Sequence, residues 1–369
     1  MEYTHGGDIY SQAIKMDFSA NINPLGLPEG VQEALIGAIS RCSCYPDSRC
    51  RSLTEELSRY HNLPKEWIIC GNGAADLIFS LVFAQKPKRA VILAPSFSEY
   101  SEALKAVGCS ITYFDLPPEK GFTLNADMFC SFLKETGNLE GGMIFLCNPN
   151  NPTGLTVDRD AVRRIGQVCR EKGALLMVDE CFCELTEEPE KISGIPWLAE
   201  NPGLFILKAF TKSYAMAGLR LGYGLCSDPE ILEKINQVRQ PWSVSLLSQE
   251  AGKAALGERE YREKTRRLIL TEREFLKREL ERLNFQVWDS KANYLFFLDK
   301  ERGPGELYRL LKEKGVLIRC CENYRGLTGQ YYRICVKTRE ENQKFLEILE
   351  MILFPGREQR RDVSWQKQL

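Results

Sequence analysis

Lysine and arginine occur together in a part of the sequence that otherwise has the composition of a protein core. Residues 208–224 read KAFTKSYAMAGLRLGYG, with Lys212 and Arg220 between two apolar runs that have the pattern of buried strands. Unpaired charge is costly to bury, so these side chains either extend to solvent or face an anion. A lysine at the end of a strand can also form a Schiff base.

Polar or glycine-rich segments follow other apolar runs in the same way. The segments are Gly71–Asp76, Asn148–Gly154, Asp179-Glu180 and Thr211-Lys212. In a parallel sheet the functional side chains gather beyond the carboxyl ends of the strands, so we expect these segments to meet. Each segment taken alone is equally typical of an ordinary turn or helix cap.

Together these segments meet the needs of pyridoxal 5′-phosphate (PLP). The bare amides of Ala74 and Ala75 at a helix N-terminus would bind its phosphate, helped by Thr211 and Arg220. A buried Asp179 can keep a pyridinium nitrogen protonated, which makes the ring an electron sink. The sequence therefore predicts PLP as the anion that Lys212 and Arg220 face.

The order of the motifs GNG, NPTG, DE, TK and GLRLGY resembles that of the aminotransferases of PLP fold type I over nearly the whole chain. The resemblance implies that Lys212 forms the Schiff base and that Asp179 is the partner of the ring nitrogen. It implies that Asn151 binds the 3′-oxygen of the ring and helps to hold the substrate carboxylate. It also implies that Phe97 stacks on the ring.

By the same resemblance Tyr45 reaches the cofactor phosphate of a neighbouring subunit, which implies a homodimer with shared active sites. Packing in the core is the alternative for this tyrosine. Two positions depart from the usual pattern, because Phe182 stands where relatives carry tyrosine and Ala209 where they often carry threonine or serine. Arg220 is the cation that we expect to lower the pKa of the Lys212 amine.

Within this family, three stretches resemble threonine-phosphate decarboxylase more than histidinol-phosphate aminotransferase: HGGDIY, FSANINPLGLP and LIRCCENYRGLTGQYYRI. The resemblance implies that Arg333 binds the substrate α-carboxylate and Arg319 its phosphate, since guanidinium groups suit both anions. His5 and Asn23 would lie nearby. A solvated charge at a strand end is the alternative for Arg319, and a disordered terminus is the alternative for His5.

The expected reaction is therefore decarboxylation of L-threonine O-3-phosphate to (R)-1-aminopropan-2-yl phosphate and CO₂, in cobalamin biosynthesis. Histidinol-phosphate aminotransferase, or another aminotransferase for phosphorylated amino acids, is the alternative enzyme. A non-catalytic PLP-binding regulatory module is a more distant alternative, and it predicts an additional DNA-binding segment.

Strand-like and helix-like segments alternate from residue 67 to about 226, which predicts an α/β domain with a mainly parallel sheet. The resemblance implies three layers in this domain and a smaller α+β domain after it. We expect an N-terminal arm at 1–27 and a large PLP-binding domain at 45–240. Residues 28–44 and 241–355 would form the small domain, with a flexible tail at 356–369.

The bulk composition narrows the classes of partner. Forty-nine basic and fifty acidic residues give a net charge of −1, which argues against a nucleic-acid partner. No apolar run reaches the roughly 20 residues of a bilayer helix, and the N-terminus lacks the apolar region of a signal peptide, so we expect a cytoplasmic protein. With two histidines and fourteen cysteines in spacings unlike structural zinc motifs, we expect no metal site and reduced cysteines.

Overall fold

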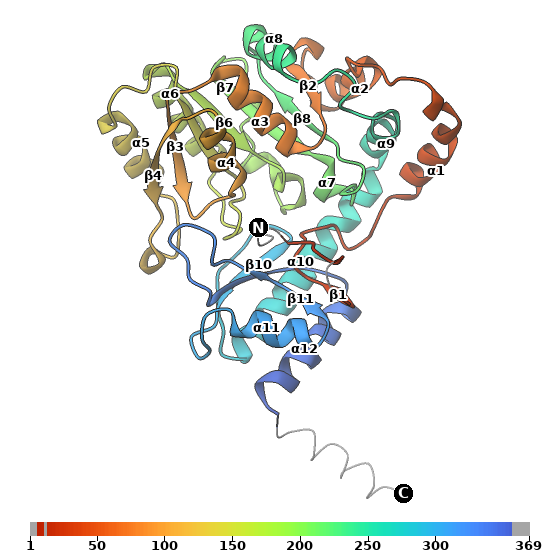
Figure 1. Ribbon diagram of the computed structural model, residues 1–369, viewed down its shortest axis with the longest axis vertical. Helices are drawn as coiled ribbons and strands as arrows, with labels where there is room; N and C mark the ends of the chain where they lie inside the picture. Colours follow the sequence, from red (N-terminus) through yellow and green to blue (C-terminus); the bar gives the residue numbers. More distant parts are fainter. Residues whose placement is uncertain (1–5, 11–12, 356–369) are drawn as a thin grey trace, which may run out of the picture.

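A computed structural model describes residues 6–10 and 13–355 of the chain, which form a large and a small domain (Figure 1). His5 and the predicted tail at 356–369 lie outside the described residues. Over the described part, no helix combines the length and apolar character needed to cross a bilayer.

Within the described residues, a seven-stranded sheet forms the centre of the large domain, in the order β2-β8-β7-β6-β5-β3-β4. Of these strands, β8 alone runs antiparallel to its neighbours. The strands are β2 (Ile68–Gly71), β3 (Arg89–Ala94), β4 (Ser110–Asp115), β5 (Met143–Cys147), β6 (Leu175–Asp179), β7 (Leu204–Ala209) and β8 (Gly222–Leu225). The predicted mainly parallel α/β sheet is confirmed.

Helices cover both faces of this sheet, because successive strand residues point to opposite sides. In β3, Ala90 and Ile92 join one core cluster, whereas Val91 and Leu93 join the other. The first cluster includes α3 (Ala74–Gln85), α4 (Glu99–Ala106) and α8 (Pro229–Val238). The second includes α2 (Arg51–His61), α5 (Ala126–Glu135), α6 (Arg159–Glu171) and α9 (Leu246–Gly257). Burial on both faces explains why these strands are apolar without alternation.

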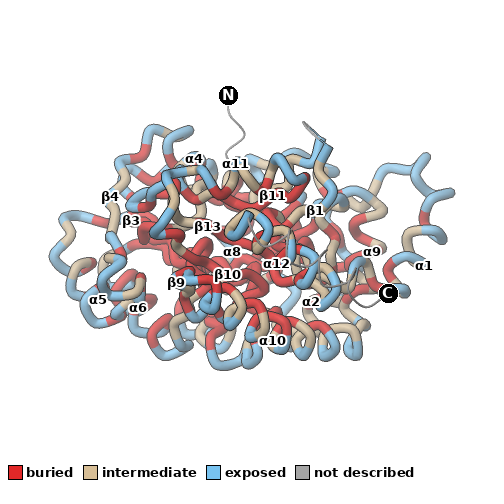
Figure 2. Tube along the Cα trace, turned by 90° about the horizontal axis from the view of Figure 1, so that it is seen from below, coloured by how far each residue is buried: buried red, intermediate tan, exposed pale blue. Residues whose placement is uncertain are grey.

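The described C-terminal part contains a four-stranded antiparallel sheet, in the order β12-β13-β10-β9, with helices packed against it (Figure 2). Its strands are β9 (Gln286–Val287), β10 (Tyr294–Leu298), β12 (Arg319–Cys320) and β13 (Tyr331–Cys335). Its helices are α10 (Arg259–Arg282), α11 (Glu306–Glu313) and α12 (Arg339–Leu353). Short 3₁₀ helices lie elsewhere: η1 (Ile39–Ser43), η2 (Lys65–Trp67), η3 (Pro118–Lys120), η4 (Cys183–Leu185), η5 (Pro189–Lys191) and η6 (Ile195–Trp197).

The N-terminal segment is attached to the small domain. Strand β1 (Met16–Asp17) pairs in parallel with β11 (Val316–Leu317). Phe18 is fully buried in the small-domain core, and its carbonyl accepts a hydrogen bond from the amide of Cys335 at 2.8 Å. The chain that follows, Ser19 to Asn21, is thereby held at the junction of the two domains.

The packing of two helices differs from the expected domain division. Helix α1 (Glu29–Ala38) and α9 pack against each other beside the large sheet (Figure 1), and Val31 shares the large-domain core cluster with Ala251. At Gly252 a Cβ atom would lie 3.0 Å from a methyl carbon of Leu53, so glycine allows α9 to approach α2 closely. Helical periodicity indicates that a helix has an apolar face, but it does not indicate which surface that face will cover.

Candidate active site

The strand register brings the predicted segments to one edge of the large sheet. Asp179 at the end of β6 pairs with Cys147 of β5 on one side and with Leu207 of β7 on the other. Lys212 follows β7 in the short helix α7 (Phe210–Ser213). The end of β2 lies next to β8, because Gly71 pairs with Gly222. A cavity of about 450 Å³ opens at this edge.

Most of the predicted site residues line this cavity. They are Ala74, Ala75, Phe97, Asn151, Asp179, Thr211, Lys212, Arg220, Arg319 and Arg333. Phe182 and Ala209, the two positions that depart from the family pattern, line it as well. Sequence reasoning did not single out Tyr324, nor the segment Ser19 to Asn21, which the small domain holds against the cavity.

Two glycines shape the end of the cavity at the N-terminus of α3. Gly73 has a φ of +84°, and a Cβ atom there would lie 2.6 Å from a terminal nitrogen of Arg220. A Cβ atom at Gly222 would lie 2.7 Å from the amide nitrogen of Ala74. No side chain among the described residues caps this helix end. Exposed amides beside a guanidinium form a site for an anion such as phosphate.

Asp179 is buried, and both of its carboxylate oxygens accept hydrogen bonds. The hydroxyl of Tyr100 donates to Oδ2 at 2.6 Å, and the amide of Cys181 donates to Oδ1 at 2.9 Å. Tyr100 is fully buried on α4 and stacks on Phe145. This tyrosine orients the aspartate, and sequence reasoning missed it. Its spacing of three residues from Phe97, at the start of a helical pattern, was the available signal, because such residues share one face.

The Lys212 amine has an environment that favours its neutral form. Burial, followed by the charge of Arg333, lowers the pKa of Lys212 to about 8. Arg220 has a smaller effect in the same direction. Arg220 therefore acts in the expected direction, but Arg333 has the larger effect. The reason is that the small domain places the Arg333 guanidinium at the same cavity, which the spacing along the chain does not reveal.

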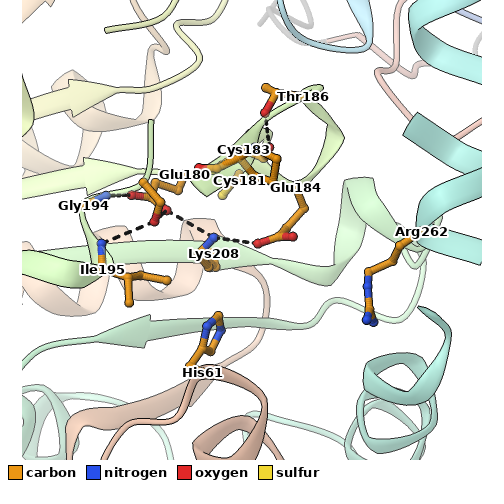
Figure 3. Close-up of polar contacts among 12 residues, drawn as sticks. His61, Glu180, Cys181, Cys183, Glu184, Thr186, Gly194, Ile195, Lys208 and Arg262 are labelled. Carbon is orange, nitrogen blue, oxygen red and sulfur yellow. Dashed lines mark hydrogen bonds and ion pairs between the residues drawn. The ribbon is translucent and has the colours of Figure 1, made fainter. Parts of the chain in front are cut away.

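A second buried lysine lies four residues earlier and has the opposite character (Figure 3). The Lys208 amine is 3.0 Å from a carboxylate oxygen of Glu184 and 3.2 Å from one of Glu180. Burial alone would lower the pKa of Lys208, but the charges of Glu184 and Glu180 raise it well above its ordinary value. Lys208 is thus held protonated and cannot act as a nucleophile, whereas Lys212 can.

Arg319 and Arg333 occupy directly opposite positions of the antiparallel pair β12–β13. Opposite residues project from the same face of a sheet, and like charges at such positions destabilise it. Both side chains are buried. The Arg333 guanidinium donates to the Asn151 side-chain oxygen at 2.5 Å and to the Ser19 carbonyl at 2.8 Å. Its Nε is buried without a hydrogen-bond partner among the described residues.

The Asn151 side chain has a defined orientation. Its oxygen accepts from Arg333 and from the Tyr324 hydroxyl, the latter at 3.2 Å. Because both neighbours are donors, the amide nitrogen of Asn151 must face the other way. That nitrogen is available as a donor to a ligand.

Two predicted residues lie away from the cavity. Tyr45 is 82% exposed and packs against Trp242, with ring centroids 4.9 Å apart. Asn23 is buried, but its amide hydrogens bond the Ser213 carbonyl and the Thr265 hydroxyl, each at 2.8 Å. This geometry is at odds with a substrate contact by Asn23, because both donors are already engaged. Instead Asn23 ties the N-terminal segment to α7.

Comparison with known proteins places the fold and the cavity in a family. A model of the family described as aminotransferase class I and II matches residues 13–349. The chain belongs to this family. Enzymes of the family use PLP, so PLP is the cofactor of this chain and the chain is an enzyme rather than a non-catalytic module.

Two relatives and one solved structure show the similarity in detail. The threonine-phosphate decarboxylase of Salmonella typhimurium is 37% identical over 95% of this chain and 96% of its own length. A histidinol-phosphate aminotransferase of Desulfitobacterium hafniense is 36% identical over 90% of this chain and 91% of its own. The crystal structure of histidinol-phosphate aminotransferase from Clostridium acetobutylicum has a TM-score of 0.84 and 28% identity, covering 92% of this chain and 99% of that one.

The cavity residues fit PLP in charge and in kind. We propose that the α3 N-terminus with Arg220 holds the phosphate, that Asp179 holds the ring nitrogen and that the Asn151 amide holds the ring oxygen. Lys212 would provide the amine for covalent attachment. When bound, PLP accepts the electron pair that remains after a bond to the substrate α-carbon breaks.

The different environments of Lys212 and Lys208 predict which lysine binds PLP covalently. Only a neutral amine has a free electron pair, so covalent attachment to the PLP-free protein should become faster as the pH rises through about 8. Visible absorbance measured from pH 6 to 10 reports this rate. Borohydride reduction and peptide mapping should then place the pyridoxyl group on Lys212. Lys208→Met should keep this attachment and Lys212→Ala should lose it. A pyridoxyl group on Lys208 would contradict the assignment.

The close approach at Gly73 predicts a specific loss of cofactor affinity. Gly73→Ala should displace Arg220 and weaken PLP binding by roughly 10- to 100-fold, the range for losing a charged hydrogen bond. Gly108→Ala is the matched control, because Gly108 has a φ of +69° but open space around its Cβ position. Both variants carry backbone strain, and only the first should lose PLP in equilibrium dialysis. Equal PLP affinities would show that Gly73 does not shape the phosphate site.

Proposed function

We propose that the protein decarboxylates L-threonine O-3-phosphate to (R)-1-aminopropan-2-yl phosphate and CO₂. The observation that supports this most is the pair of buried arginines, Arg319 and Arg333, directly opposite each other at the cavity. Two adjacent guanidinium groups match a substrate with two anionic groups, a carboxylate and a phosphate. The similarity to the Salmonella typhimurium enzyme over nearly the whole chain points to the same substrate.

The roles of the side chains follow from their positions. Arg333 would bind the α-carboxylate and Arg319 the phosphate. Loss of CO₂ leaves an electron pair at the α-carbon, and a proton must then be added there. Lys212 lies at the cavity with an amine whose pKa is about 8, so it can carry that proton near neutral pH.

Transamination of a phosphorylated amino compound, as in histidinol-phosphate aminotransferase, is the second candidate. The 36% identity to the Desulfitobacterium hafniense enzyme favours it. Both reactions would use the same cofactor residues, and they differ in which bond at the α-carbon breaks.

An assay with purified PLP-loaded protein separates these two reactions. With L-threonine O-3-phosphate we expect release of CO₂ without consumption of 2-oxoglutarate. Arg319→Gln should raise the KM for this substrate about 10- to 100-fold, because a charged hydrogen bond is lost, and leave the PLP absorbance unchanged. Glutamate-dependent amination of imidazole acetol phosphate, without CO₂ release from threonine phosphate, would instead establish the aminotransferase.

We further propose that the protein is a homodimer in which Tyr45 contacts the cofactor phosphate of the partner subunit. Tyr45 packs on Trp242, which is 49% exposed, and Ile36 and Ile39 in the preceding helices α1 and η1 are 71% and 60% exposed. Exposed apolar side chains are unfavourable in water and suit a protein interface.

Light scattering should accordingly give twice the mass of the chain. Tyr45→Phe should remain dimeric and bind PLP more weakly by roughly 3- to 10-fold, the value of one ordinary hydrogen bond. A monomer with full activity would exclude the shared site.

The cytoplasmic location remains a prediction. All fourteen cysteines are free thiols in the structure, including the exposed Cys42 and Cys44. Free thiols persist in a reducing compartment, which supports this location.

A further inference from the structure

A second cavity lies directly behind the wall of the active-site cavity. It has a volume of about 470 Å³ and lies between the large domain and the loop that joins β12 to β13. Phe97 and Tyr324 line both cavities, and within the described residues they are the side chains that the two cavities share. Phe97 is the residue proposed to stack on the cofactor. Tyr324 is in contact with Arg319, the proposed ligand of the substrate phosphate.

The Tyr324 side chain is held in place by contacts with both domains. Its hydroxyl donates to Asn151 of the large domain at 3.2 Å. The Arg319 guanidinium of the small domain lies 5.3 Å from the ring centroid, in cation–π contact. The neighbouring Arg325 forms two hydrogen bonds to Asp115 at the end of β4, at 2.9 and 3.2 Å. These contacts hold the Tyr324 ring between the two cavities.

The Tyr324 ring lies where the length of the substrate side chain matters. Arg319, the proposed phosphate ligand, lies against the Tyr324 ring, and the ring separates this part of the active-site cavity from the second cavity. Beyond the ring, the second cavity is lined by polar side chains that include Ser98, Ser101 and Lys105. Removal of the ring would join this polar space to the active site.

We infer that Tyr324 determines substrate size, by closing the active site to phosphorylated amino compounds with side chains longer than that of threonine phosphate. This inference rests on the proposed function, because it takes the Arg319 end of the cavity as the phosphate end. A pocket wall of this kind discriminates against one extra methylene by about 10- to 200-fold.

The test compares wild type, Tyr324→Phe and Tyr324→Ala as PLP-loaded proteins. Each is mixed rapidly with O-phospho-L-serine, L-threonine O-3-phosphate, O-phospho-L-homoserine or O-phospho-L-tyrosine. The dissociation constant is read from how the initial change in PLP absorbance, before turnover, depends on ligand concentration. Wild type and Tyr324→Phe should bind the two longer ligands at least tenfold more weakly than threonine phosphate. Tyr324→Ala should bind the longer ligands at least tenfold more tightly than wild type does.

If Tyr324 has a merely structural role, Tyr324→Ala should bind all four ligands more weakly by a similar factor. Such a result would overturn the inference. The inference would also be overturned if wild type and Tyr324→Ala discriminated equally between the short and the long ligands. If Tyr324→Ala does not fold, Tyr324→Leu removes most of the same wall and is judged by the same profile. Failure of wild type to turn over threonine phosphate would count against the proposed function. In that case the binding of unphosphorylated serine, homoserine and tyrosine tests the effect of Tyr324 on ligand size independently of the proposed function.

Discussion

Excess positive charge around one partly desolvated cavity is the constraint on which the rest of the site depends. Among the described residues, two carboxylates line it, Asp179 and Glu99, and four cations, Lys212, Arg220, Arg319 and Arg333. Like charges in a poorly solvated space repel one another strongly. The arrangement therefore favours ligands that carry several negative charges, such as a phosphorylated cofactor and a phosphorylated amino acid. Together with burial, which has the larger effect, the charge of Arg333 lowers the pKa of Lys212 to about 8.

Two lysines four residues apart, Lys208 in β7 and Lys212 in α7, have opposite chemistry. Lys208 points to the side where Glu180 and Glu184 pair with it, and that cluster also contacts Arg266 of α10. Lys212, four residues later in α7, lines the cavity instead. Local charge partners, rather than burial alone, thus decide which amine is reactive. The buried ion pairs at Lys208 additionally join the end of β6 to the end of β7, close to Asp179.

The site is complete only where the two domains meet. The large domain supplies Asp179, Lys212 and the N-terminus of α3, which would hold the cofactor. The small domain supplies Arg319, Arg333 and the loop around Tyr324, which would recognise the substrate. The N-terminal segment adds the Ser19 carbonyl as an acceptor for Arg333. The Lys212 amine and the proposed substrate ligands thus belong to different domains, so the relative position of the domains affects both.

The sequence by itself determined the parallel sheet and the motifs at its carboxyl edge, and it predicted Lys212 as the reactive lysine, because those features are local. Near-continuous apolar strands and the turns after them are contained in short segments around Gly73, Asn151 and Lys212. Contacts between distant segments were decided by the tertiary structure. Tyr100 reaches Asp179 across 79 positions of sequence, and Arg333 reaches Asn151 across 182. No local pattern encodes such contacts, since they arise only when separate apolar surfaces pack together.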